Sequence, residues 1–168
     1  MGDYLIRPAA QADLALIRLW RAQPHVMEWW GDPDIEPEAE KLVDPNIDLW
    51  LVAHEGRPFA FVQDYRVHAW DPHPFSYLPQ GARGLDLFIG EADMLGQGHG
   101  QRFLRQHVEA LFALGIPAVG ADPNPENFRA RRAYEKAGFT LASGPLDTPW
   151  GHAVLMHRHA QQAGPQPS

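Results

Sequence analysis

The 168-residue chain contains no cysteine. Disulfide frameworks, cysteine-ligated zinc sites, iron–sulfur clusters and thiol nucleophiles are therefore excluded. Basic residues are also scarce, since 14 Lys and Arg stand against 21 Asp and Glu and the formal net charge is −7. Nucleic-acid binding depends on clustered Lys and Arg that displace phosphate counterions, so we expect no nucleic-acid partner. The acidic balance is compatible with a cationic ligand.

Long apolar runs are absent as well. No segment approaches the ~20 apolar residues that a membrane helix requires, and the first eight residues lack the basic and apolar regions of a signal peptide. We therefore expect a cytoplasmic protein with no membrane partner. The nine histidines include no i, i+4 pair with a following acidic ligand, which is the spacing of a helical zinc site, so we also expect no metal.

The chain has the length of one domain, which we place at residues 1–158, followed by a disordered tail at 159–168. Strands are predicted at 4–7, 49–54, 59–67, 84–90, 118–121, 139–142 and 153–157. Helices are predicted after Asp13, at 24–30, at 97–114, and from an N-cap at Asn124 with Pro125 as the first helical residue to Lys136. Hairpin-linked strands precede two strand–helix units, which indicates a mixed α/β (α+β) sheet.

Two proline-rich stretches, 31–47 and 68–81, show no periodicity. We interpret both as loops, the first with at most one helical turn.

Three glycines stand between a predicted strand and the clearest predicted helix, within residues 95–101 (LGQGHGQ). Without Cβ atoms, successive backbone N–H groups can turn toward one anion, and the helix N-terminus adds the positive end of its dipole. The segment can therefore bind a phosphate or pyrophosphate. Its spacing fits neither G-x-G-x-x-G nor a Walker loop. The alternative interpretation is a tight connection before a helix.

A second polar pair lies further along the chain. Asn127 and Tyr134 are seven residues apart, which on a helix places them on nearly the same face, roughly 10 Å apart along the axis. An amide and a phenol on one face can hold two points of an elongated ligand. The alternative is a surface asparagine and a half-buried core tyrosine.

Together, these segments resemble the acetyl-CoA-binding motifs of the GCN5-related N-acetyltransferase (GNAT) superfamily. That pattern is Gln/Arg-x-x-Gly-x-Gly/Ala, then Asn and Tyr-x-x-x-Gly-Phe, and this chain has Asn127 and residues 134–139 (YEKAGF). The resemblance covers residues 3–157 and implies a mostly antiparallel central sheet flanked by helices, with acetyl-CoA as cosubstrate. It assigns cofactor binding to Leu87, Phe88, Ile89, Gln97, Gly98, His99, Gly100, Gln101 and Asn127.

A narrower resemblance involves residues 25–31 (HVMEWWG), 83–86 (RGLD) and 122–127 (DPNPEN). These segments look like those of the aminoglycoside 6′-N-acetyltransferases. Some hydroxamate-siderophore acetyltransferases share Glu-Trp-Trp-Gly, but they tend to carry His where this chain has Asp86. The aminoglycoside branch is therefore the closer match.

The resemblance implies direct transfer of an acetyl group from CoA to a primary amine. Asp86 is the expected base, or alternatively a structural carboxylate or one that only holds the cationic amine. Backbone N–H groups of residues 87–89 are expected to stabilise the thioester oxygen. Tyr134 is expected to assist the departing sulfur. Substrate binding is assigned to Trp29, Trp30, Asp64 and Asp122, and of the two tryptophans we expect one in the core and one in the cleft.

Three functions compete at this stage. The leading one is acetylation of an aminoglycoside-like or other polyamine small molecule. The second is acetylation of a siderophore precursor or another small amine, and the third is CoA binding without catalysis. The presence of both Asp86 and Tyr134 argues against the third.

Overall fold

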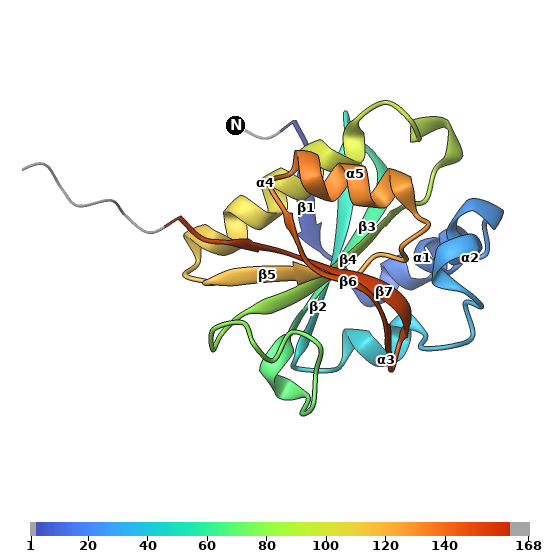
Figure 1. Ribbon diagram of the computed structural model, residues 1–168. Coiled ribbons are helices and arrows are strands. Elements are labelled where there is room, and N and C mark those ends of the chain that lie inside the picture. The colour runs from blue at the N-terminus through green and yellow to red at the C-terminus, as the bar shows by residue number, and fades with distance from the viewer. Residues whose placement is uncertain (1–2, 162–168) are drawn as a thin grey trace, which may run out of the picture.

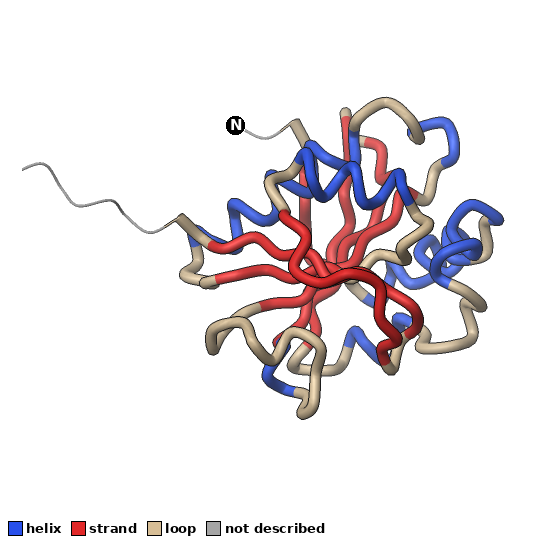
Figure 2. The backbone as a smooth tube through the Cα atoms, viewed as in Figure 1, coloured by secondary structure: helices blue, strands red, loops and turns tan. Residues whose placement is uncertain are grey.

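The computed structural model describes residues 3–161 as one sheet with helices on both faces (Figure 1, Figure 2). The strands are β1 (Leu5–Pro8), β2 (Ile47–His54), β3 (Arg57–Arg66), β4 (Arg83–Ile89), β5 (Ala118–Ala121), β6 (Thr140–Thr148) and β7 (Gly151–His159). The helices are α1 (Leu14–Arg21), α2 (Pro24–Trp30), α3 (Glu38–Leu42), α4 (His99–Ala113) and α5 (Phe128–Lys136). The strand order is β1-β2-β3-β4-β5-β7-β6, and among the strands of residues 3–161 only β4 and β5 pair in parallel. The predicted mixed, mostly antiparallel sheet is confirmed.

The predicted order of strands and helices is confirmed as well, and the helical turn expected within residues 31–47 is α3. The last two strands are longer than predicted because β6 and β7 form a hairpin. Thr140 pairs with His157 at its open end and Thr148 pairs with Gly151 next to the turn. The alternation of neither strand reveals this pairing. β7 ends at His159, and residues 162–168 of the predicted tail lie outside the described residues.

Helix α5 begins later than predicted. Its N-cap is Asn127, whose side-chain oxygen accepts a hydrogen bond from the Ala130 backbone N–H at 3.2 Å. Asn124 instead accepts a bond from the Glu126 backbone N–H at 2.9 Å, within the turn before the helix. The prediction of Asn124 as the N-cap was therefore wrong, because asparagine serves in turns as readily as at helix starts.

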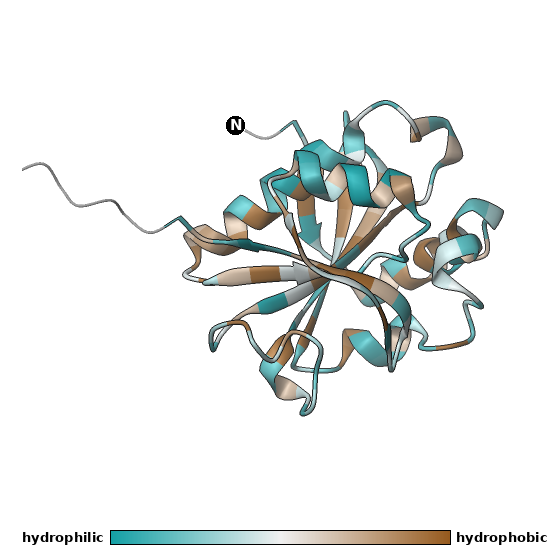
Figure 3. Cartoon of the chain, viewed as in Figure 1, coloured by the Kyte–Doolittle hydropathy of each residue, from teal (hydrophilic) through white to brown (hydrophobic). Residues whose placement is uncertain are grey.

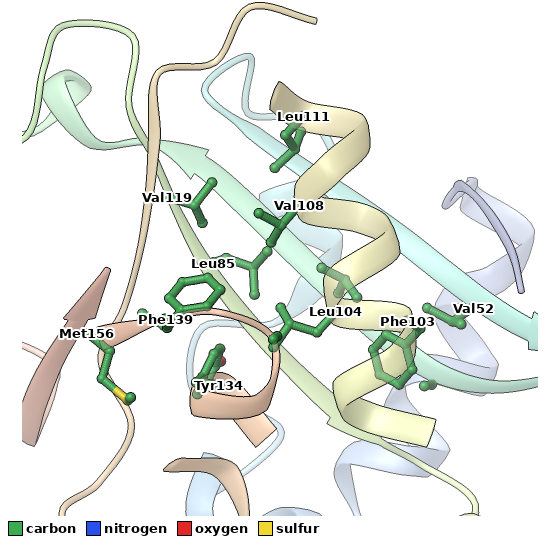
Figure 4. Close-up of a cluster of buried hydrophobic side chains, with 14 of the residues drawn as sticks. Val52, Leu85, Phe103, Leu104, Val108, Leu111, Val119, Tyr134, Phe139 and Met156 are labelled. Atoms are coloured by element: carbon green, nitrogen blue, oxygen red, sulfur yellow. The ribbon is translucent and has the colours of Figure 1, made fainter. Parts of the chain in front are cut away.

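Two apolar layers hold the helices to the sheet. Helices α4 and α5 cover one face through a cluster that includes Leu85, Leu104, Val108 and Val119, as Figure 4 shows. Helices α1 and α2 cover the opposite face, where Trp20 packs among the second cluster. In Figure 3 apolar residues follow the strands, and the outward side of α5 is hydrophilic. The core therefore lies on both sides of β3 and β4.

The parallel pair β4–β5 is very short. Its register joins Arg83 to Val119 and Gly84 to Gly120, and no further partners follow. The five remaining residues of β4, 85–89, continue past the end of β5 and pair only with β3. The backbone edge of β4 that would face β5 is thereby left open in the middle of the sheet.

A buried ion pair stands beneath this region, on the α4 side. Asp64 of β3 is fully buried, and its carboxylate accepts hydrogen bonds from Trp50 Nε1 (2.7 Å), Arg83 Nε (2.7 Å) and His107 Nε2 (2.9 Å). Burial alone would raise the pKa of Asp64, but its contacts with His107 and Arg83 outweigh that effect and lower the pKa below its ordinary value. The prediction that Asp64 lines a substrate cleft was therefore wrong, since its side chain is enclosed by the core.

We predict that Asp64→Asn lowers the free energy of unfolding by about 3 kcal/mol at neutral pH, because it removes the buried counter-ion of Arg83 and leaves only the exposed Asp48 carboxylate, at 2.7 Å. A lowered carboxyl pKa contributes stability above the unfolded pKa of about 3.9, and this contribution is lost as pH falls through the folded pKa. The difference between wild type and variant should therefore shrink below about pH 4. Urea unfolding across this range measures it.

The matched control is Asp147→Asn, whose carboxylate pairs with His152 but is 94% exposed. Exposed pairs contribute little, so this change should alter stability by less than about 0.5 kcal/mol. Equal effects of the two substitutions would contradict the assignment of Asp64 to a core ion pair.

Candidate active site

Two aspartates meet where β4 and β5 separate. Gly84 and Gly120 are register partners in parallel strands, so the residues two positions later, Asp86 and Asp122, lie on the same face of the sheet. Their carboxyl groups are hydrogen-bonded to each other. Gln63, the register partner of Asp86 on β3, donates from Nε2 to Asp86 Oδ2 at 2.9 Å. The short strand pairing thus brings two acids from distant sequence positions together.

The surroundings of this pair favour the protonated form of Asp122. Burial, followed by the negative charge of Asp86 and the hydrogen bond to it, raises the pKa of Asp122 well above its ordinary value. Two carboxylates in contact cannot both ionise without strong repulsion. One negative charge shared by two carboxyl groups is a suitable counter-ion for an ammonium group.

Two tyrosine hydroxyls lie near the pair. Tyr65 of β3 covers Gly84 so closely that a Cβ there would stand 2.2 Å from its ring. Tyr134 reaches the pair from α5, packed edge-on against Phe139 at 5.3 Å (Figure 4). Burial, reinforced by the charges of Asp86 and Asp122, raises the pKa of both phenols well above 10. Both hydroxyls therefore remain protonated at neutral pH.

A cavity of about 450 Å³ opens around these groups. That volume lies within the range of small-molecule sites. Its aromatic lining consists of Trp29, Trp30, Tyr65, Trp70, Tyr134 and Trp150. Its carboxyl groups belong to Glu36, Glu40, Asp44, Asp86 and Asp122, against the two basic groups of Arg21 and Lys41. The excess of acids over bases favours a cationic ligand, and the indoles suit the face of a sugar ring.

The structure gathers seven of the fifteen predicted site residues around this cavity. Asp86, Asp122, Tyr134, Asn127, Trp29 and Trp30 all line it, together with Leu87. Trp29 is 39% exposed. Trp30 packs edge-on against Phe88 at 5.1 Å, so it belongs to the apolar cluster and to the cavity wall at once. The expected division of the tryptophans into one core and one cleft residue is therefore only half right.

Other lining residues were missed. Gln63 and Tyr65 flank Asp64, and strand alternation places both on the face opposite to it. The period-two pattern of this strand was thus the available signal. Trp70 and His73 stand in one aperiodic loop, and Trp150 stands at the β6–β7 turn. No local pattern there points to a ligand.

The glycine loop leads into α4 as predicted. Gly96 and Gly98 have φ of 72° and 81°, left-handed conformations that favour glycine. Gly98 is the N-cap of α4 and no side chain caps the first turn. Gln97 donates to the Asp93 carbonyl at 2.6 Å, and the His99 ring turns inward to accept from or donate to the Tyr4 hydroxyl at 2.8 Å. The backbone N–H groups of this turn therefore remain available to an anion.

The far end of β4 is held from α2. His25 donates from Nε2 to the Ile89 carbonyl at 2.8 Å, and the Phe88 side chain is buried in the cluster beneath α1 and α2. These contacts fix the open backbone edge of residues 87–89, whose role toward the cofactor stays a prediction.

Within residues 3–161 there is no group of three or more His, Cys, Asp or Glu side chains able to hold a metal ion. The helices of this same part of the chain include none long and apolar enough to cross a membrane.

Several known proteins are similar to this chain in sequence and in architecture. Residues 9–144 match the family model described as an acetyltransferase (GNAT) domain, and the chain belongs to this family. It is 32% identical over 162 residues to the type 1 aminoglycoside N(6′)-acetyltransferase of Klebsiella pneumoniae, covering 90% of this chain and 80% of that protein. It is 44% identical over 77 residues to a kanamycin resistance protein of Rhizobium radiobacter, covering 45% of this chain and 70% of that protein.

A solved structure of the aminoglycoside acetyltransferase AAC(6′)-Ib in complex with coenzyme A and kanamycin superposes with a TM-score of 0.82 at 31% identity. That match covers 93% of this chain and 94% of the other. The GNAT fold and the N-acetyltransferase class expected from the motifs are thereby confirmed.

The carboxyl pair predicts a pH-dependent cost. A carboxyl pKa that is higher in the folded than in the unfolded chain gives stability that is full below about pH 3.9 and is lost as pH rises through the folded pKa. Wild type should therefore lose stability relative to Asp122→Asn as pH rises from 4 to 9. The loss is about 1.4 kcal/mol for each pH unit between the two pKa values. Urea unfolding of both proteins measures it, and parallel pH profiles would rule out a proton-sharing pair.

Proposed function

We propose that this protein is an acetyl-CoA-dependent N-acetyltransferase whose acceptor is a primary amine of an aminoglycoside-like polyamine. The observation that carries this proposal is the carboxyl pair of Asp86 and Asp122, which lies beside Tyr134 at the gap between β4 and β5. The named relatives act on or bind aminoglycosides. The acidic, indole-lined cavity supports the same acceptor class for this chain.

The cofactor fits the open side of this gap. The N-terminus of α4, with Gly98 at its cap, offers free N–H groups to the CoA pyrophosphate. The unpaired edge of residues 87–89 can continue the sheet toward an extended, amide-containing arm. An arm placed there brings the thioester between Asp86 on one side and Tyr134 on the other. A backbone N–H of this edge then faces the thioester oxygen as it gains charge.

The amine requires both acids. The shared negative charge of Asp86 and Asp122 attracts the ammonium form, which has no lone pair and cannot attack. Transfer of its proton to Asp86, directly or through water, frees the nitrogen lone pair. The nitrogen attacks the thioester carbon, the carbon–sulfur bond breaks, and the protonated Tyr134 hydroxyl donates its proton to the departing sulfur. The nitrogen loses its second proton as the amide forms, and this proton, passed through water, restores the Tyr134 hydroxyl. The carboxyl pair thus both attracts the cationic acceptor and removes the proton that blocks its attack.

Asp86→Asn removes the charge with little change in shape. We expect kcat/KM for kanamycin to fall about 100-fold or more while the acetyl-CoA dissociation constant stays within about twofold of wild type. If Asp86 is the base, activity recovers partly as pH rises and free amine accumulates. If it only attracts the cation, the loss is chiefly in KM and shrinks at high salt.

Steady-state kinetics with kanamycin and calorimetry with acetyl-CoA separate these outcomes. Loss of acetyl-CoA binding with normal kanamycin binding would place Asp86 in the cofactor site and refute both roles.

Tyr134→Phe keeps the ring packing against Phe139 and removes only the hydroxyl. We expect kcat to fall roughly 10- to 1000-fold, because the thiolate then leaves without a proton donor. The urea midpoint should change little, since the hydroxyl makes no hydrogen bond within residues 3–161. A kcat equal to that of wild type would mean that Tyr134 serves the core alone.

A further inference from the structure

His73 carries a buried hydrogen-bond donor with no partner. The side chain lies in the 68–81 loop, is 7% exposed and lines the cavity. Its Nδ1 accepts a hydrogen bond from the Phe75 backbone N–H at 3.0 Å. A nitrogen that accepts such a bond bears no proton, so in the neutral ring the proton is on Nε2. That Nε2–H is inaccessible to water and has no partner within residues 3–161.

The imidazole is neutral at physiological pH. Burial lowers the pKa of His73, and the negative charge of Asp86 opposes this only in part. A neutral donor differs from the adjacent carboxyl pair, which attracts cations. The ring therefore adds no charge that would repel a polycationic acceptor.

The surroundings define what the donor can meet. The Tyr65 ring lies 5.6 Å from the imidazole and the Trp150 indole 5.1 Å from it, both centre to centre. Trp150 is 49% exposed at the tip of the β6–β7 hairpin. It can therefore move aside with less loss of packing than Tyr65. An ammonium group has no lone pair to accept from Nε2–H. The negative charge of Asp86 close by disfavours an anion, so an uncharged oxygen or nitrogen with a lone pair fits this donor.

We propose that His73 is a specificity-determining residue whose Nε2–H donates a hydrogen bond to a hydroxyl or ring oxygen of the acceptor, reached when the Trp150 indole moves aside. The inference rests on the proposed function and sharpens it. Asp86 and Asp122 recognise the charge that every polyamine carries, whereas His73 recognises oxygen. The acceptor is then a polyhydroxylated amine and not an alkyl polyamine. An unpaired buried donor in the free protein is the cost of this selectivity.

His73→Asn is the test variant. The asparagine side-chain oxygen replaces Nδ1 as acceptor for the Phe75 N–H, so the turn is retained, but nothing donates at the position of Nε2. We expect kcat/KM for kanamycin to fall at least 10-fold, mainly through KM, with the KM for acetyl-CoA unchanged. Ser76→Ala is the matched control, because it removes the His73 N–H to Ser76 Oγ bond of 3.1 Å from the same loop and leaves the donor in place.

A series of monodeoxy kanamycins locates the bonded oxygen. One analogue should be used equally well by wild type and His73→Asn, because the bond is absent from both. If kcat/KM of His73→Asn for kanamycin stays within twofold of wild type, or if Ser76→Ala loses as much, the role of His73 is overturned and the proposed function still stands. Failure of wild type to acetylate any aminoglycoside would refute the proposed function, and the inference with it.

Discussion

The separation of β4 from β5 is the constraint on which the rest of this site depends. Two parallel strands that paired along their full length would satisfy each other's backbone groups and leave no room for a ligand in the middle of the sheet. Here the pairing stops at Gly84 and Gly120. Their missing Cβ atoms make room for the rings of Tyr65 and Phe75, which pack directly onto them. The open backbone edge and the cavity beyond it both follow from this short register.

The same register explains the electrostatics. Asp86 in β4 and Asp122, the residue after β5, each stand two positions beyond the last register partners of these strands, so their carboxyl groups meet without sequence proximity. Holding two acids together in a half-enclosed site costs stability at neutral pH, and a bound cation offsets that cost. The buried ion pair of Asp64 with Arg83 and His107 lies on the opposite face of the same strands and ties them to α4. One face of this region thus carries a buried ion pair, and the other carries the carboxyl groups that line the cavity.

The features of the site that depend on local sequence patterns could be predicted from the sequence. Tyr134 and Asn127 stand seven residues apart on a predicted helix, and Asp86 lies within the predicted strand 84–90. The assignment of Asp64 to the substrate site was wrong for a physical reason. Its neighbours Gln63 and Tyr65 line the cavity, so strand alternation places the Asp64 side chain in the core, where it contacts His107. Whether a carboxylate on a strand faces a cavity or a buried arginine depends on which side chains pack on each face of the sheet, and the strand's own sequence does not show this.

Other features could not be predicted from local sequence patterns, because they depend on contacts between distant segments or on the backbone path of a loop. The contact of His73 with Trp150 joins an aperiodic loop to a hairpin tip, and no periodicity in either segment predicts it. The hydrogen bond from Phe75 that fixes the tautomer of His73 depends on the backbone path of that loop.

The central claim is that the gap between β4 and β5 delivers an acetyl group to an amine held by the carboxyl pair. The most direct measurement is the product formed by the wild-type protein from isotope-labelled acetyl-CoA and kanamycin, analysed by mass spectrometry and NMR. The account predicts one labelled acetyl group on a primary amine of kanamycin for each CoA released. Release of CoA without an acetylated amine, or no release at saturating concentrations of both compounds, would contradict it.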